Sequence, residues 1–306
     1  MSQRFVAEFK AGALSKYYRL LRPAAWTCFL LPFAVGIAVG AEAASFRNLL
    51  FATISFAAWM SFSFTVNAIY DRDVDRFHDG RTKDIALSLQ PLVTGEISVL
   101  EAWLLALIFL AISLASAAAV SVEFFATMSF ANLLGYLYSC PPFRFKARAV
   151  LDVATNAAAA TLIFHAGMLV GNHVEGLEVY AAAFVLAATF YIPTALSDYE
   201  FDLKAGLKNT PAFFGPQKTL KALYPLSAAS VVLWFFVMVN SGSMLLRVLS
   251  PLIIFYTLAY VYVIRRVWDG RKLNVTPNLI LVPFGAISAI LYIYTIIIMF
   301  AYSQNF

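Results

Sequence analysis

The fold of this chain is decided by residues 48–75, which read NLLFATISFAAWMSFSFTVNAIYDRDVD. The segment 48–70 is long and apolar enough to cross a bilayer, because a transmembrane helix needs about 20 mainly apolar residues. The stretch then ends in a run of charged residues. Charge beside hydrocarbon is costly, so a charged group retained at the end of a span usually marks a functional site.

Two polar clusters share a spacing of four residues, Asn67, Asp71 and Asp75 after one apolar stretch and Asp198 and Asp202 after another. Helical residues turn by about 100° each, so positions four apart share one face of a helix. Asp73 and Glu200 fall roughly 200° from the first carboxylate of their cluster and are predicted to face elsewhere, at the surface.

Each cluster suits a divalent cation. Two carboxylates one helical turn apart repel each other by about a few tenths of a kcal/mol. Mg²⁺ removes this repulsion, because it takes oxygen ligands and commonly binds one or two carboxylates together with substrate phosphates. Two such clusters in a membrane chain predict a pyrophosphate held between two metal ions.

The composition is that of a membrane protein. The chain is 61% hydrophobic and 13% charged, whereas a soluble domain is nearer half apolar and a quarter charged. Its two cysteines predict no disulfide framework, and its three scattered histidines argue against a zinc site. The net charge of +5 lies on one side of the predicted membrane topology, which argues against nucleic acid as a partner.

Apolar stretches predict nine transmembrane spans. They lie near 24–41, 48–70, 99–119, 122–138, 150–171, 178–197, 219–240, 244–264 and 278–302. The N-terminal segment and alternate loops carry 20 of the 22 Lys and Arg residues. Because short-loop Lys and Arg mark the cytoplasmic side, we predict a multi-pass protein of the cell membrane with its N-terminus inside and its C-terminus outside. Both acidic clusters then face the cytoplasm.

The N-terminal segment 1–22 predicts an amphipathic helix at the membrane interface. Its apolar residues recur every four positions, at Phe5, Phe9, Ala13, Tyr17 and Leu21. The two long loops after the acidic clusters resemble each other, since each carries a Pro-x-x-x-Gly segment, at 91–95 and 211–215. Internal repeats of this kind often place a site between the two halves of a membrane protein.

At these residues the chain resembles the UbiA-type family of intramembrane prenyltransferases. The family motif N-x-x-x-D-x-x-x-D is similar to Asn67, Asp71 and Asp75. Its second motif, D-x-x-x-D followed by a basic residue, x and Gly, is similar to Asp198, Asp202, Lys204 and Gly206. Residues 138–146, YSCPPFRFK, are similar to the family's Y-S-x-P-P-x-R-x-K, and Arg22-Pro23 also matches. Many members carry Asp where this chain has Ala68, a position turned away from the metal-binding face.

The resemblance implies an all-α integral membrane protein, a single domain over 1–306, with nine transmembrane helices around a central cavity open to the cytoplasm. Loops 71–98 and 198–218 form a cap over the active site. The implied reaction is Mg²⁺-dependent transfer of an isoprenyl group from a polyprenyl diphosphate to a lipophilic acceptor. Acceptors in this family include quinone precursors, chlorophyllide, haem, geranylgeranylglyceryl phosphate and carotenoids.

The residues themselves suit this chemistry. The candidate catalytic and metal-binding residues are Asn67, Asp71, Asp75, Asp198 and Asp202, for two Mg²⁺ ions that stabilise the leaving pyrophosphate. Nearby cations and a tyrosine are candidates for binding the diphosphate: Arg22, Arg81, Lys83, Tyr138, Arg144, Lys146, Lys204 and Lys208. Arg144 and Lys146 can equally serve only to orient the protein in the membrane.

Ionisation of a prenyl diphosphate also leaves an allylic cation, which aromatic rings stabilise and shield from water. The candidates for this chamber are Phe64, Tyr136, Tyr138, Phe190 and Tyr191, which can also be ordinary packing residues. Asn132, Asn156 and His165 lie within spans, where they either bond between helices or contact the acceptor. The role of Asp152 is open.

Two other functions compete with the prenyltransferase. A membrane cation transporter could use the acidic clusters as a Mg²⁺ site, although the outer half of the chain offers no ionisable relay. A structural membrane protein would not need two metal-spaced clusters. We therefore predict a prenyltransferase whose partners are a prenyl diphosphate, a lipophilic acceptor and membrane lipid.

Overall fold

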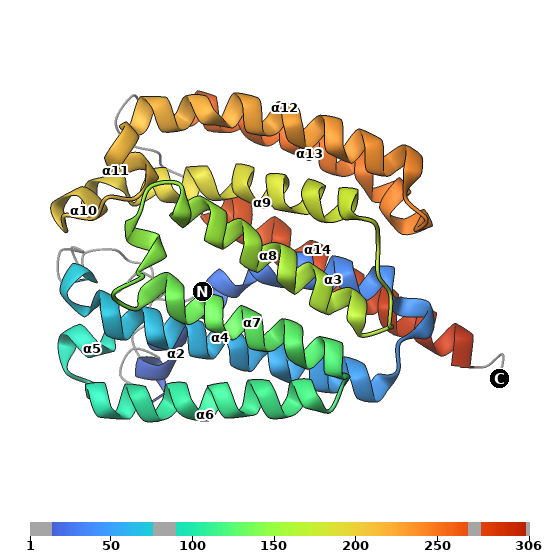
Figure 1. The fold of residues 1–306 in the computed structure, drawn as a ribbon, viewed down its shortest axis with the longest axis horizontal. Helices are drawn as coiled ribbons and strands as arrows, with labels where there is room; N and C mark the ends of the chain where they lie inside the picture. The colour runs from blue at the N-terminus through green and yellow to red at the C-terminus, as the bar shows by residue number, and fades with distance from the viewer. Residues whose placement is uncertain (1–13, 76–89, 269–276, 304–306) are drawn as a thin grey trace, which may run out of the picture.

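The computed structural model describes residues 14–75, 90–268 and 277–303, and within them the fold is helical without a strand. The longer helices in Figure 1 are α3 (Thr27–Val39), α4 (Phe46–Asp75), α6 (Val99–Ala118), α7 (Val122–Ser139), α8 (Leu151–Leu169), α9 (Leu177–Ser197), α12 (Pro216–Asn240), α13 (Met244–Val267) and α14 (Pro277–Ser303). The shorter elements are α2 (Ser15–Leu21), α5 (Pro91–Thr94), α10 (Tyr199–Lys204), α11 (Thr210–Phe214) and the 3₁₀ turns η1 (Pro23–Trp26), η2 (Ala41–Ala43) and η4 (Phe145–Ala147).

Seven stretches of the described residues are long and apolar enough to cross a membrane. They contain α3 together with α2, and α4, α6, α9, α12, α13 and most of α14. Helices α7 and α8 fall outside this set and carry polar residues such as Asn132, Asp152 and His165. The membrane-embedded all-α fold is therefore supported by seven spans, and the nine-span topology with its orientation stays a prediction.

Helix α8 is polar for a membrane helix because protein rather than lipid surrounds it. In Figure 1 it lies at the centre of the bundle, and it packs against α3, α7 and α9. Its His165 Nδ1 lies 2.9 Å from the Tyr180 hydroxyl of α9. In α7, Asn132 donates to Ser113 Oγ of α6 at 3.0 Å. Both residues thus bond between helices, which was one of the two predicted roles.

Two pairs of glycines set the packing of α3 against α8. A Cβ added to Gly36 would collide with the Phe164 carbonyl oxygen, and one added to Gly171 would collide with the Gly40 carbonyl oxygen. Gly167 faces α3 in the same way. The two G-x-x-x-G segments therefore bring the backbones into direct contact, as small residues do between membrane helices. A fully buried core that includes Phe33 and Ile163 lies beside this contact.

The bundle places the two acidic clusters at one end. Helices α5, α10 and α11 lie together at the left of Figure 1, where α4 and α9 also end. Helix α2 packs near them, since Arg19 pairs with Glu96 and the Tyr17 hydroxyl donates to Glu101 at 3.0 Å. The described part of the predicted interfacial helix is thus docked on protein through Leu20, which is fully buried. Its first 13 residues lie outside the described ranges.

We expect Gly167→Ala to destabilise the fold by about 1–3 kcal/mol, the usual cost of overpacking a close contact. The new methyl group would meet the Phe33 backbone, so α3 and α8 would have to separate. The measurement is the thermal unfolding midpoint of the detergent-purified protein. Gly242→Ala is the control, because no atom lies within 4 Å of the added Cβ there. Equal midpoints for both variants would contradict this account of the packing.

Candidate functional site

The first acidic cluster ends α4. This helix continues for 30 residues, so that Asn67, Asp71 and Asp75 occupy its last turns on one face. Asp75 is buried, whereas Asp73 between them is exposed. The helical spacing thus separates the carboxylates as predicted. Glu200, the corresponding acid of the second cluster, is exposed as well.

Cations from the segment after α7 contact the first cluster. The buried ammonium of Lys146 pairs with Asp71 Oδ1, and Arg144 Nη2 lies 3.5 Å from the same oxygen. Burial lowers the pKa of Lys146, and the charge of Asp71 opposes this shift. The motif around residues 138–146 therefore brings two cations to Asp71, while their predicted contact with the diphosphate stays a prediction.

Arg22 contacts the same cluster from the N-terminal side. Its Nη2 lies 3.6 Å from Asp75 Oδ2, a buried oxygen without a hydrogen-bond donor in the described structure. With its amide oriented so that the oxygen faces Arg22, Gln90 accepts from Nε and Nη2 of that residue. Gln90 is buried beside the Pro-x-x-x-Gly segment and was not predicted, because its sequence neighbourhood carries no motif that points to Arg22.

The second acidic cluster lies at the junction of α9 and α10. Asp198 ends α9, and Asp202 lies in α10. Asn209 Nδ2 donates to Asp202 Oδ2 at 2.6 Å, a contact that sequence analysis missed although Asn-Thr-Pro at 209–211 is a typical helix start. The side chain of Asp198 is exposed to water, although many protein atoms lie around it.

Charge interactions show that the two clusters converge. Asp198 lies close enough to Arg22, Asp75 and Asp71 for their charges to act on it. Asp202 is influenced in the same way by Asp198, Asp71 and Lys146. Burial raises the pKa of Asp198 to about 6, and burial together with the Asp198 charge raises that of Asp202 to about 7. The two clusters thus form one carboxylate-rich site whose charges act on one another.

Two hydrogen bonds connect the helices around the acidic clusters. The hydroxyls of Tyr138 on α7 and Tyr191 on α9 lie 3.0 Å apart. Both tyrosines are near enough to the carboxylates, Asp152 included, to interact with their charges. Asn67 Nδ2 donates to Ser139 Oγ at 3.3 Å. Tyr138, Tyr191 and Asn67 thus belong to one site with the acidic clusters.

The predicted aromatic chamber is only partly assembled. Phe190 packs with rings that were not predicted, at centroid distances of 5.7 Å to Tyr256, 4.7 Å to Tyr260 and 5.7 Å to Phe284. These rings come from α13 and α14, which no sequence spacing could connect to α9. Phe64 packs at the edge of the core beside α3 and α8.

Tyr136 does not join the Tyr138–Tyr191 pair. It packs with Tyr70 and Trp103, on the α6 side of the bundle. The reason is geometric, because residues two apart on a helix point about 200° away from each other. Tyr136 thus lies with the cluster of Tyr70 and Trp103, and its place in the cation chamber stays a prediction.

Four further cations were predicted to bind the diphosphate: Arg81, Lys83, Lys204 and Lys208. Lys204 and Lys208 are exposed on α10 and the segment after it, and no contact of theirs with the carboxylates is seen among the described residues. Arg81 and Lys83 lie outside the described ranges.

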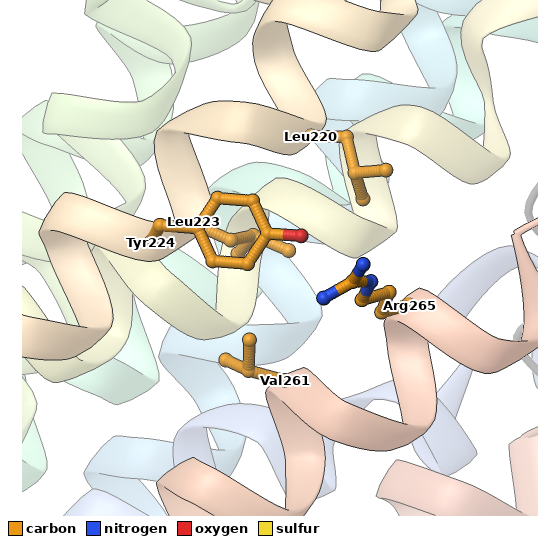
Figure 2. Close-up of a pocket in the computed structure, with 5 residues that line it drawn as sticks. All are labelled: Leu220, Leu223, Tyr224, Val261 and Arg265. Carbon is orange, nitrogen blue, oxygen red and sulfur yellow. The ribbon is translucent and has the colours of Figure 1, made fainter.

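A shallow hollow between α12 and α13, shown in Figure 2, is lined by none of the site residues and by no carboxylate. It is therefore separate from the candidate site.

Within the described part of the chain, no group of three or more His, Cys, Asp or Glu side chains is close enough together to hold a metal ion, so each cluster offers a pair of carboxylates one helical turn apart. Pairs nevertheless fit Mg²⁺, which is commonly held by one or two carboxylates while phosphate oxygens complete its coordination. The buried Asp75 Oδ2 without a donor is the kind of oxygen that such an ion takes.

Comparison with known proteins gives a consistent result. The model of the UbiA prenyltransferase family matches residues 29–279. A solved structure of a UbiA homologue from Archaeoglobus fulgidus, bound to DMAPP and Mg²⁺, has 59% sequence identity and a TM-score of 0.89. The match covers 93% of this chain and 99% of that one.

Two curated relatives are more distant. A lycopene elongase/hydratase of Haloarcula japonica is 28% identical over 220 residues, which are 66% of this chain and 67% of the relative. A 4-hydroxybenzoate octaprenyltransferase of Pseudomonas aeruginosa is 30% identical over 210 residues, which are 65% of this chain and 62% of the relative.

The raised carboxyl pKa values predict how stability depends on pH. An unfolded Asp titrates near 3.8, whereas Asp202 titrates near 7 in the folded protein. The folded state therefore binds more protons between these values, and its stability falls as pH rises. We expect the thermal unfolding midpoint of the metal-free protein to rise as the pH is lowered from about 8 to about 5.5. Asp202→Asn should weaken this dependence of the unfolding midpoint on pH. A wild-type midpoint that rises as the pH rises would contradict the prediction.

Proposed function

Because the chain belongs to the UbiA prenyltransferase family, we propose that it transfers an isoprenyl group from a prenyl diphosphate to a lipophilic acceptor in a Mg²⁺-dependent reaction at the converging acidic clusters. The observation that carries this proposal is that two carboxylate pairs lie near enough for their charges to interact, with Arg22, Arg144 and Lys146 paired to the first of them. The solved homologue bound to DMAPP and Mg²⁺ supports both the donor class and the metal.

The metal would be held by two sets of ligands. Asp71 and Asp75 would hold one ion. The amide nitrogen of Asn67 donates to Ser139, so its amide oxygen would lie on the side of this ion. Asp198 and Asp202 hold the other. When bound, Mg²⁺ supplies Lewis-acid stabilisation of the negative charge that develops on the departing diphosphate.

The cations of the chain bind and orient the diphosphate. Arg22 and Arg144 offer planar guanidinium groups that suit bidentate phosphate contacts, and Lys146 acts as a point charge. In the structure described here these cations are paired with the carboxylates, which keeps them pointed at the site before a donor arrives. Their preorganisation lowers the cost of charge separation, because little reorganisation remains at the moment of reaction.

Aromatic rings near the carboxylates protect the allylic cation. The rings of Tyr138 and Tyr191 lie near the carboxylates, and Phe190, the neighbour of Tyr191 on α9, packs with rings of α13 and α14. Such rings exclude water and attract a cation through their quadrupoles. An electron-rich acceptor then needs no strong general base. The predicted cytoplasmic facing of the site and the cap formed by loops 71–98 and 198–218 complete the proposal.

The competing transporter function loses its basis, because the family to which the chain belongs consists of prenyltransferases. The two curated relatives are named for a carotenoid and for 4-hydroxybenzoate. Assays for the acceptor should therefore include both compound classes, along with geranylgeranylglyceryl phosphate, and should detect products by mass spectrometry.

Donor binding gives the first test. We expect geranylgeranyl diphosphate to bind the purified wild-type protein with Mg²⁺ and to bind at least about tenfold more weakly without it, because the metal neutralises the paired carboxylates. Isothermal titration calorimetry measures both affinities, and Asp71→Asn should lose the metal-dependent part. Absence of binding with geranyl, farnesyl and geranylgeranyl diphosphates alike would refute the proposed function.

A mutant series separates the metal-binding face from its surroundings. Asp71→Asn or Asp198→Asn should reduce prenyl transfer by about 100-fold or more, as expected for loss of a group that stabilises developing charge. Asp73→Asn should stay within about threefold of wild type, because Asp73 is an exposed residue on another side of α4 and exposed substitutions are usually mild. Turnover is measured with the identified acceptor, and size-exclusion profiles verify folding. Equal losses in all three variants would exclude the face-based assignment.

A further inference from the structure

Two segments far apart in sequence run side by side next to the candidate site. Arg148 and Lys208 form an isolated parallel bridge, and Val150 N–H donates to Thr210 Oγ1 at 2.8 Å. The first segment begins at Lys146, which pairs with Asp71 of the first cluster. The second segment begins at Asp202 of the second cluster. Their pairing therefore connects the two acidic clusters.

Asp152 secures this pairing. Its side chain has 0% exposure, at the start of α8. One carboxylate oxygen, Oδ2, accepts from the Thr210 backbone N–H at 2.9 Å, and the other accepts from the Thr210 hydroxyl. A buried carboxylate is tolerated only when its oxygens are satisfied in this way. The proposed chemistry gives Asp152 no role of its own.

The next residue toward the site is Asn209. Its Oδ1 accepts from Ala212 N–H at 3.1 Å, as the N-cap of α11, and its Nδ2 donates to Asp202 Oδ2 at 2.6 Å. Both ends of the amide are thus engaged, so that the orientation of Asn209 follows from the backbone position of residues 209–210. That position is the one that Asp152 holds.

Val150 shows that this pairing is imposed by the tertiary structure. Its φ of 69° is in a region that a β-branched residue rarely adopts. Such a conformation persists only where the surroundings determine it. Here the backbone N–H of Val150 points to Thr210, whose hydroxyl donates in turn to Asp152.

We propose that Asp152 and Thr210 are positioning residues that lock residues 208–210 to residues 148–150, and so hold Asp202 at the correct place relative to the Asp71 cluster. This inference rests on the proposed function, since it assigns the Asp198–Asp202 pair to a metal ion. Loss of the lock weakens metal binding at that pair and leaves the Asp71–Asp75 pair intact. A purely structural role of Asp152 would instead lower stability without distinguishing the two pairs.

The test is a titration of the detergent-purified full chain with Mn²⁺, in place of Mg²⁺, followed by electron paramagnetic resonance. A non-reactive thiolo analogue of geranyl diphosphate is present throughout. Thr210→Val removes the hydroxyl and keeps the shape, whereas Thr210→Ser keeps the hydroxyl. Asn209→Ser removes the donor to Asp202 and keeps a good N-cap residue. Thr189→Val is the matched control, because Thr189 is a buried threonine that donates to Val185 O within its own helix.

We expect the wild type to bind Mn²⁺ at two sites. Thr210→Val, Asn209→Ser and Asp152→Asn should weaken one of them by about 10- to 100-fold, as is usual when a partner of a metal ligand is removed. Thr210→Ser and Thr189→Val should bind as the wild type does. Combining Thr210→Val with Asp202→Asn should give no further loss at the weakened site, because both changes act on the same ligand.

Three outcomes decide the proposal. Unchanged Mn²⁺ binding in Thr210→Val and Asn209→Ser would overturn the positioning role while leaving the proposed function intact. Equal weakening of both sites would overturn it too, in favour of a general structural role. A wild type without diphosphate-dependent Mn²⁺ binding would refute the proposed function itself. If Asp152→Asn does not insert or fold, the comparison of Thr210→Val with Thr210→Ser still decides the question, because only the first removes the hydroxyl that bonds to Asp152.

Discussion

The site depends on the repulsion between carboxylates that the fold brings near one another at one end of the bundle. Asp71, Asp75, Asp198 and Asp202 come from two helix ends, and their charges act on one another. In a medium of low dielectric such repulsion is much stronger than in water. Lys146, Arg144 and Arg22 offset part of it. A bound cation would offset the rest, which gives the site its affinity for metal and diphosphate together.

Such a site needs a rigid frame, because displacement of a ligand by about 1 Å can abolish the chemistry. The frame begins at the C-terminal ends of α3 and α8, where glycines allow direct backbone contact. At its other end, α8 carries Asp152 in its first turn, near the acidic clusters. The same helix thus joins the core of the bundle to the segments that carry the charged residues.

Sequence patterns were sufficient for much of the fold and of the site. Hydropathy located each long helix within a few residues, and helical spacing separated Asp71 and Asp75 from the exposed Asp73. Local patterns succeed here because both features depend on neighbours within one or two turns. Tyr136 and Tyr138 are close in sequence, yet they pack on different sides of α7, which local spacing alone does not resolve into partners. Gln90 and Asn209 were missed, because their partners lie 68 and 7 residues away and no motif connects them.

By itself, the sequence determined that the protein is a helical membrane protein with two carboxylate pairs and a family motif around them. Those features are encoded in composition and short-range periodicity, which need no knowledge of how helices meet. Only the tertiary structure decided that Arg22 reaches Asp75, that Phe190 packs with rings of α13 and α14, and that Thr210 bonds to Asp152. These contacts join residues separated by dozens of positions or more. Their formation depends on the packing of whole helices, which the one-dimensional pattern of apolar residues does not specify.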